Sequence, residues 1–226
     1  MAAWKAALLN EASRRFQDQQ KYNTDADASC TQYMAPISPT PPGLIDGALM
    51  KLAGEVNRET GFPLLSPGAT VIDLGCGDGR WLISTAQFFQ SRSCPVNCVG
   101  CDLDDALLAK ARAAAAAIRT EGAAQKSSIT FLRQDLMAAD VSGATVVIAY
   151  LFREGCDVVM GKLERELEPT GTAVISVGFE LRGWRKAQWT LRVNGSVPCY
   201  FYAPPWRANQ QPETGEEAEE AEPGAR

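Results

Sequence analysis

The chain has 226 residues, of which 46% are hydrophobic, and a formal net charge of -5. This length suits one domain with a sizeable core, and no apolar run approaches the roughly 20 residues that a helix needs to cross a bilayer. Six glutamates against one arginine after Arg207 account for the negative excess, so the rest of the chain is about neutral. The sequence shows no basic stripe or basic helix, and we therefore expect no nucleic-acid partner.

The composition predicts three regions. We expect a helix over residues 4–19 within an N-terminal lead-in of residues 1–34, a folded domain over residues 35–206, and a disordered tail over residues 207–226 that is rich in Glu, Ala, Pro and Gly. Seven cysteines without a secretory signal peptide indicate a reducing compartment. We expect a monomer in the cytoplasm, with mitochondria as the alternative.

Apolar periodicity predicts a helix over residues 43–56, with Leu44, Ala48, Leu52 and Val56 on one face. Beyond it, short β-branched runs alternate with helical patterns, which indicates a mostly parallel sheet covered on both faces. The predicted strands cover residues 70–74, 97–103, 128–134, 144–152 and 172–179, and the predicted helices cover residues 79–90, 104–119 and 155–167.

The last part of the domain predicts a β-hairpin. Residues 188–193 and 198–203 are β-rich, and Asn194-Gly195 between them favours the positive φ angles of a tight turn. The fold class that we expect is therefore α/β: a doubly wound, Rossmann-like sheet of seven strands, mostly parallel, with an antiparallel hairpin at the end.

Gly75, Gly77 and Gly79 follow the first predicted strand and open the next helix. Glycines in this position let a ligand approach the backbone closely, near the partly positive start of a helix. The alternative of a tight turn without a ligand explains one glycine better than three. A dinucleotide is disfavoured, because its fingerprint needs another glycine three residues after the second, where this chain has Arg80.

The stretch "VIDLGCGDGR", residues 71–80, resembles the first motif of class I, seven-strand S-adenosylmethionine-dependent methyltransferases. The predicted order of five strands and a hairpin is similar to their fold. The resemblance implies S-adenosyl-L-methionine as cofactor and S-adenosyl-L-homocysteine as its product. It assigns Asp73 and the backbone around Gly75 and Gly77 to the methionine end of the cofactor.

Two further acids end predicted strands. In the family, an acid at the place of Asp102 accepts hydrogen bonds from the ribose hydroxyls, and Asp135 is similar to the acid that meets the adenine amino group. Each acid alone has an ordinary interpretation as a helix cap or strand end. Acids at the carboxyl ends of successive parallel strands point to one crevice. The resemblance also assigns to this crevice Thr40, Leu74, Cys76, Leu103, Leu136 and Tyr150.

Cys94, Cys98 and Cys101 match the three-cysteine spacing that radical enzymes use to hold an iron–sulfur cluster. Cys98 and Cys101 fall in a predicted strand, where positions three apart face opposite sides of the sheet. Thiols arranged in this way cannot converge on one cluster. The chain has no histidine, which also disfavours zinc, so we expect no metal.

The methyl acceptor is encoded outside the cofactor motifs. The fourth predicted strand ends "IAYLF", without the proline pair and aromatic residue that nucleic-acid amino-methyltransferases carry there. The segment "APISPTPP" resembles one that precedes the first motif in archaeal broad-specificity and mitochondrial protein-lysine methyltransferases. Pro36, Pro39 and Thr40 match that pattern. Ile37 replaces its aromatic residue, for which Tyr33 is a candidate substitute.

A protein with an accessible lysine is therefore the expected partner. Methylation of lysine needs a neutral amine in line with the methyl group, and a narrow apolar channel favours the neutral form. Aromatic rings tolerate the cationic sulfonium. We expect Tyr150 to line this channel, with Tyr33, Phe152 and Trp184 behind it. Two alternatives remain: a small-molecule methyltransferase with the N-terminal segment as a lid, and a non-catalytic methyltransferase-like subunit.

Overall fold

The computed structural model describes residues 39–57, 60–118, 126–167 and 171–204. The predicted helix over residues 4–19, Tyr33 and the acidic tail lie outside the described residues. The division of the chain into three regions therefore stays a prediction. No helix among the described residues is long and apolar enough to span a membrane.

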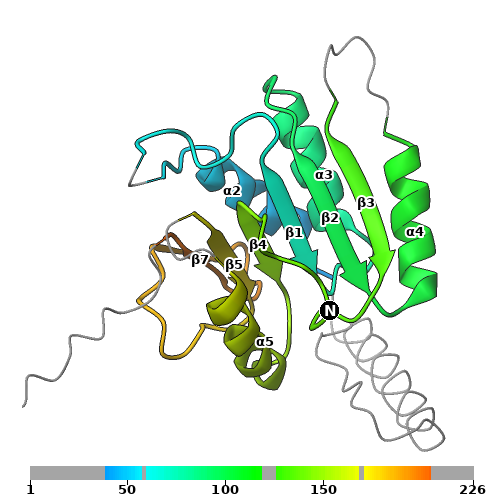
Figure 1. The fold of residues 1–226 in the computed structure, drawn as a ribbon. Helices are drawn as coiled ribbons and strands as arrows, with labels where there is room; N and C mark the ends of the chain where they lie inside the picture. The colour runs from blue at the N-terminus through cyan, green and yellow to red at the C-terminus, as the bar shows by residue number, and fades with distance from the viewer. Residues whose placement is uncertain (1–38, 58–59, 119–125, 168–170, 205–226) are drawn as a thin grey trace, which may run out of the picture.

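One seven-stranded sheet forms the centre of the domain, in the order β3-β2-β1-β4-β5-β7-β6 (Figure 1). Strands β1 to β5 run parallel, and β7 and β6 complete the sheet in antiparallel pairing. The predicted α/β fold with a terminal antiparallel hairpin is confirmed. The strands are β1 (Thr70–Leu74), β2 (Asn97–Asp102), β3 (Ser128–Arg133), β4 (Val146–Ala149), β5 (Ala173–Val177), β6 (Trp189–Leu191) and β7 (Cys199–Tyr202).

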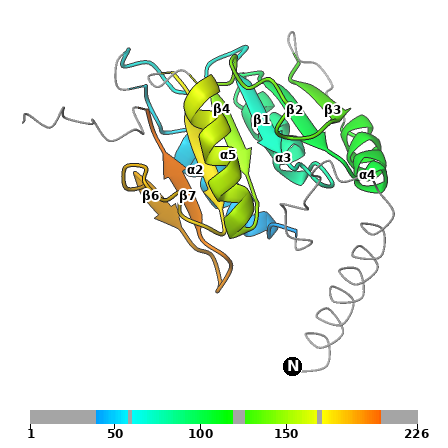
Figure 2. The ribbon, with the colours of Figure 1, turned by 60° about the horizontal axis from the view of Figure 1, so that its bottom comes forward.

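Helices cover both faces of the sheet, as its buried central strands require. The helices α2 (Pro42–Leu52), α3 (Arg80–Gln90) and α4 (Asp105–Ala116) contribute to one hydrophobic core, and α5 (Arg153–Glu166) contributes to a second core on the other face. Figures 1 and 2 show α2 and α3 on the side of the sheet opposite α5. Asp104 caps α4 by accepting from the backbone N–H groups of Ala106 and Leu107.

The helix predicted over residues 43–56 ends earlier than expected. Leu44, Ala48 and Leu52 share the buried face, but α2 stops at Leu52. Tighter turns follow, in which Gly54 N–H donates to Lys51 O and Glu55 N–H to Leu52 O. Val56 instead forms an isolated β-bridge with Pro63 and is 50% exposed. The prediction that Val56 belongs to the helical face was wrong, because the helix ends at Leu52 and Val56 pairs with Pro63 instead.

The predicted hairpin turn is confirmed. Asn194 and Gly195 have φ angles of 46° and 72°, the positive values that a two-residue hairpin turn requires. The hairpin packs against α2, and a Cβ on Gly47 would lie 3.0 Å from Leu191 Cδ2. Helix α2 and the hairpin therefore lie side by side.

The two cysteines of β2 lie on opposite faces of the sheet, as predicted. Cys98 belongs to the core shared by α2, α3 and α4, and Cys101 belongs to the core under α5. Burial raises the pKa of the Cys98 thiol to about 12 and that of Cys101 to about 11, so both stay neutral near pH 7. Among the described residues, no group of three or more acidic or cysteine side chains is arranged to hold a metal ion.

Candidate active site

The glycine turn after β1 has the backbone shape that only glycine adopts freely. Gly75, Gly77 and Gly79 have φ angles of 78°, 54° and 75°. The backbone N–H groups of Gly75 and Cys76 donate to Cys101 O at 2.9 and 3.0 Å, which holds the turn against the end of β2. The turn thus lies at the carboxyl edge of the sheet, where α/β domains bind ligands.

Gly77 and Gly79 have different surroundings. A Cβ on Gly79 would lie 2.5 Å from Phe131 Cζ and 2.9 Å from Ala111 Cβ. Gly79 is therefore needed for close packing of α3 on its neighbours. A Cβ on Gly77 would meet only Leu107 Cδ1, at 4.0 Å. Packing does not explain Gly77, whose open side leaves room for a ligand against the backbone.

Asp102 connects the turn to the end of β2. Its Oδ2 accepts from Gly77 N–H at 2.7 Å and its Oδ1 accepts from Asp104 N–H at 2.9 Å. Each carboxylate oxygen has two lone pairs, so both can also accept from a pair of ligand hydroxyls. The backbone holds this carboxylate in one orientation, facing the glycine turn.

Asp73 is the buried acid of the site, with 3% of its surface exposed. Burial, followed by the nearby carboxylates of Asp102 and Asp78, raises its pKa to about 8. A ligand with positive charge would compensate this concentration of acid. S-adenosylmethionine carries an ammonium and a sulfonium group, and so its positive charges fit this group of carboxylates.

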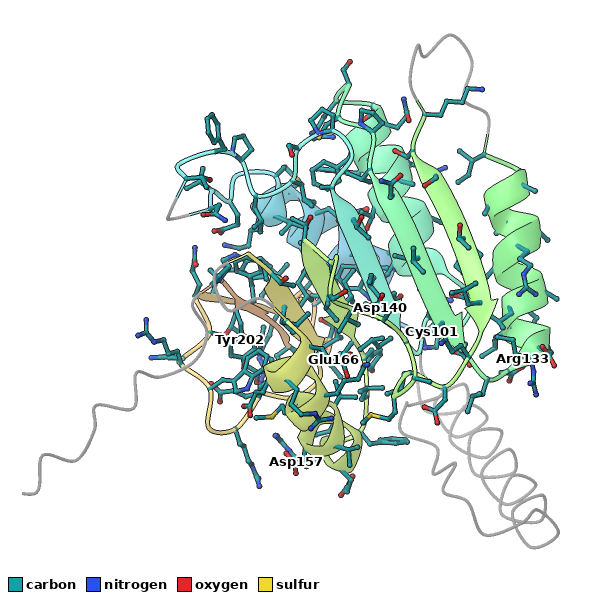
Figure 3. All side chains as sticks on the ribbon, viewed as in Figure 1. Cys101, Arg133, Asp140, Asp157, Glu166 and Tyr202 are labelled. Carbon is teal, nitrogen blue, oxygen red and sulfur yellow. The ribbon has the colours of Figure 1, made fainter. Side chains whose placement is uncertain are left out.

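The ends of β2 and β3 bring the third acid into the same region. Asp102 pairs with Arg133 in the sheet register, and Figure 3 shows Cys101 and Arg133 at neighbouring strand ends. Asp135 follows β3, and its Oδ1 accepts from Met137 N–H at 2.8 Å. The second oxygen can accept from an amino group. Leu103, which is 40% exposed, offers an apolar surface beside Asp102.

Three other residues that the resemblance assigns to the crevice have buried side chains. Leu74 and Leu136 belong to the core under α5, and Cys76 belongs to the opposite core. Their side chains therefore contribute to packing on the two faces of the sheet. Gly100 in β2 was not predicted as part of the site, although a Cβ there would lie 2.8 Å from Cys76 Sγ. A glycine inside a predicted strand was the available signal for this close approach.

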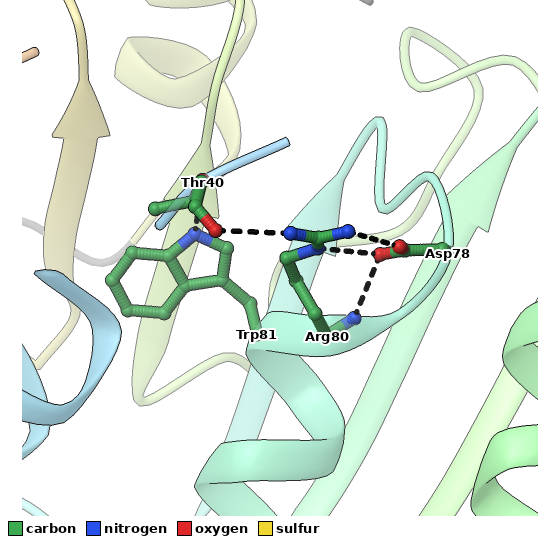
Figure 4. A network of polar contacts seen from close by, with 4 residues as sticks. All are labelled: Thr40, Asp78, Arg80 and Trp81. Atoms are coloured by element: carbon green, nitrogen blue, oxygen red, sulfur yellow. Dashed lines mark hydrogen bonds and ion pairs between the residues drawn. The ribbon is translucent and has the colours of Figure 1, made fainter. Parts of the chain in front are cut away.

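Thr40 is held by the start of α3 (Figure 4). Trp81 Nε1 donates to Thr40 Oγ1 at 3.0 Å, and Arg80 Nη1 donates to Thr40 O at 3.1 Å. Arg80 also pairs with Asp78. Thr40 was predicted as a site residue, whereas Asp78, Arg80 and Trp81 were not, because no local pattern joins residues about 40 positions apart.

Tyr150 follows β4, which ends at Ala149 rather than at residue 152 as predicted. The ring of Tyr150 lies against Gly178, where a Cβ would be 3.3 Å from Tyr150 Cε2. Gly178 has a φ angle of 91° and directly follows β5. Phe152, at the N-cap of α5, is 38% exposed. Tyr150 and Phe152 thus stand at the carboxyl edge of the sheet, beside the strand that carries Asp73.

Trp184 has different neighbours. Its ring meets Tyr202 edge to face with centroids 5.6 Å apart, and its Nε1 donates to Glu164 Oε1 at 2.7 Å. It packs in the core under α5, whereas Tyr150 packs against the core on the opposite face. The structure does not bring Trp184 next to Tyr150.

The sheet order and the glycine turn define a class I, S-adenosylmethionine-dependent methyltransferase. The model of the ANTKMT methyltransferase domain family matches residues 73–188, just over half of the chain, and the chain belongs to this family. It is an enzyme, and its methyl donor is S-adenosylmethionine.

Two relatives are similar to it over most of their length. A protein-lysine N-methyltransferase of Saccharolobus islandicus (strain REY15A) is 36% identical over 129 residues, which are 57% of this chain and 74% of that protein. An RNA methyltransferase from Salinibacter ruber, solved in complex with S-adenosyl-L-homocysteine, is 28% identical with a TM-score of 0.58, covering 76% of this chain and 97% of that one.

Proposed function

We propose that this enzyme transfers a methyl group to a lysine side chain of a protein. The observation that carries the proposal is the place of Tyr150, whose ring lies on Gly178 at the edge next to the glycine turn. The relative at 36% identity, a protein-lysine N-methyltransferase, supports the same acceptor. The six cysteines among the described residues are free thiols, which supports a reducing compartment such as the cytoplasm.

The residues of the crevice would hold the donor as follows. Asp102 accepts from the ribose hydroxyls, Asp135 from the adenine amino group, and Asp73 balances the positive charge of the methionine end. The bound donor supplies a methyl group that the sulfonium already activates. The protein therefore needs only to hold that end still and to exclude water around it.

Tyr150 and Phe152 would form the wall through which the lysine enters. A lysine has a pKa near 10.4 in water and must lose its proton before its Nζ can attack the methyl carbon. A desolvated aromatic wall favours the neutral amine. The neutral amine would take the methyl group from the donor, and the donor's sulfur would keep the electron pair of the broken carbon–sulfur bond. The proton that the lysine loses beforehand would pass to water.

RNA is the second candidate acceptor, because the similar Salinibacter ruber structure is of an RNA methyltransferase. The chain before its acidic tail has a net charge near zero, which weighs against RNA as the acceptor. A small molecule is the third candidate. One assay separates the three, since labelled product is found in protein, in RNA or in the filtrate of low molecular mass.

The test is methyl transfer from radiolabelled S-adenosylmethionine into lysate, fractionated into protein, RNA and small molecules. We expect label in protein that resists acid and base and is recovered as methyl-lysine. Tyr150→Ala should lower kcat by about ten-fold or more through lost alignment, with a smaller change in S-adenosylhomocysteine affinity. Tyr150→Phe keeps the ring and serves as the matched control. Label confined to RNA or to small molecules would contradict the lysine acceptor.

A further inference from the structure

Arg80 bonds in two directions at once. Its Nε donates to Asp78 Oδ1 at 2.8 Å and its Nη2 pairs with Asp78 Oδ2, while its Nη1 donates to Thr40 O at 3.1 Å. Trp81, the next residue, donates from its indole to Thr40 Oγ1 at 3.0 Å. Figure 4 shows both residues holding Thr40, one by its backbone and one by its side chain.

This network joins three parts of the molecule. Thr40 precedes α2, Asp78 lies between two glycines of the turn, and Arg80 and Trp81 begin α3. Thr40 and Trp81 are 2% and 3% exposed. Gly77, the neighbour of Asp78, donates to the carboxylate of Asp102. The segment before α2 is therefore bonded to the same turn that orients Asp102.

The segment before α2 depends on donors from elsewhere. Pro39, Pro41 and Pro42 surround Thr40, and proline has no N–H with which to build a local hydrogen-bond ladder. The buried carbonyl and hydroxyl of Thr40 need partners. Arg80 and Trp81 supply both of them.

We propose that Arg80 is a positioning residue for methyl transfer. It fixes the Thr40 segment against the glycine turn, so that this wall of the cofactor crevice is already shaped when the donor arrives. The role requires the planar guanidinium, because a lysine is a point charge and cannot direct parallel bonds at Asp78 and a further bond at Thr40. The proposal rests on the cofactor site and is independent of the acceptor.

The test compares Arg80→Lys and Arg80→Gln with matched changes at Arg92. Arg92 lies just beyond the other end of α3 and likewise donates to a backbone carbonyl, that of Phe88. Calorimetric titration with S-adenosylhomocysteine, well below the unfolding temperature of each variant, should show about ten-fold weaker binding for both Arg80 variants. Arg92→Lys and Arg92→Gln should stay within about two-fold of the wild type.

Hydrogen exchange supplies a readout of the positioning itself. The backbone amides at the start of α2 should exchange faster in both Arg80 variants than in the wild type. In the Arg92 variants their exchange rates should be unchanged. If Arg80→Lys binds S-adenosylhomocysteine as tightly as the wild type, charge alone suffices and the positioning role is overturned. Unchanged binding by Arg80→Gln overturns it as well.

A second pair of variants covers the case in which Arg80 variants do not fold. Trp81→Phe and Thr40→Val each remove one end of the same hydrogen bond while keeping most of the buried volume. Each should weaken binding a few-fold, and the double variant should lose no more than either single variant. Additive losses, or none, overturn the proposal. A wild type that does not bind S-adenosylhomocysteine would instead overturn the cofactor site itself.

Discussion

The proposed cofactor side and the proposed acceptor side of the sheet edge are built in different ways. The cofactor side, at the ends of β1, β2 and β3, consists of a bare glycine backbone and strand-end carboxylates that the backbone orients. The acceptor side, after β4 and β5, consists of aromatic side chains, with Tyr150 held by its contact with Gly178. The first side therefore depends on local backbone shape, and the second depends on packing between distant residues.

The two glycines of the turn sharpen this comparison within the cofactor side. A Cβ on Gly79 would clash with Phe131 and Ala111, whereas one on Gly77 would meet only Leu107, at 4.0 Å. Both have positive φ, so both carry the same backbone demand. A substitution of Gly79 should therefore mainly lower the free energy of unfolding, and a substitution of Gly77 should mainly lower the affinity for the cofactor.

The largest effect should come from Gly79→Ala. The new Cβ would lie 2.5 Å from Phe131 Cζ, and overpacking together with positive φ should lower the free energy of unfolding by about 3 kcal/mol. Urea denaturation measures this loss. Gly143→Ala is the control, because a Cβ there meets nothing within 4 Å. Equal midpoints for the two variants would show that Gly79 is not a packing glycine.

Gly77→Ala should keep the fold and lose the ligand. Its Cβ meets only Leu107, at 4.0 Å, so stability should fall by only about 1 kcal/mol from the backbone angle. S-adenosylhomocysteine should bind about ten-fold more weakly, since the methyl group occupies the space of close approach. Calorimetry checks this, and an unchanged affinity would place the ligand away from Gly77.

The affinity for S-adenosylmethionine should depend on pH through the protonation of Asp73. Burial raises its pKa to about 8 in the ligand-free protein, so its carboxyl is protonated below that pH. A cationic ligand favours the carboxylate, and binding therefore releases a proton and strengthens as pH rises from 6 toward 8, by up to about ten-fold per unit. The rise should end near pH 8, above which Asp73 is already ionised before the ligand binds.

The matched variant for this titration is Asp73→Asn, which should bind weakly with a flat profile over the same range. The folded state of the wild type holds a proton that the unfolded state releases above pH 4. The ligand-free wild type should therefore lose stability between pH 4 and pH 8. A wild-type affinity that does not change with pH would show that Asp73 is already ionised.

The cofactor side could be predicted from the sequence because its signals are local. Glycine spacing after one apolar strand and an acid after each of the next two suffice to predict a shared edge. The acceptor side could not be predicted in the same way. Trp184 was predicted to lie behind Tyr150. It packs on Tyr202 in the core under α5 instead. The contact between Arg80 and Thr40 could not be predicted either, because the two residues lie 40 positions apart in the sequence.

The most direct test of the cofactor site is calorimetric titration of the wild type and of Asp102→Ala with S-adenosylhomocysteine. We expect the wild type to bind and Asp102→Ala to bind about ten-fold more weakly or worse, because two ligand hydroxyls and Gly77 N–H lose their acceptor. Asp140→Ala is the control, since that exposed carboxylate only accepts from Ser142. Equal affinities for the wild type and Asp102→Ala would contradict the account of the crevice.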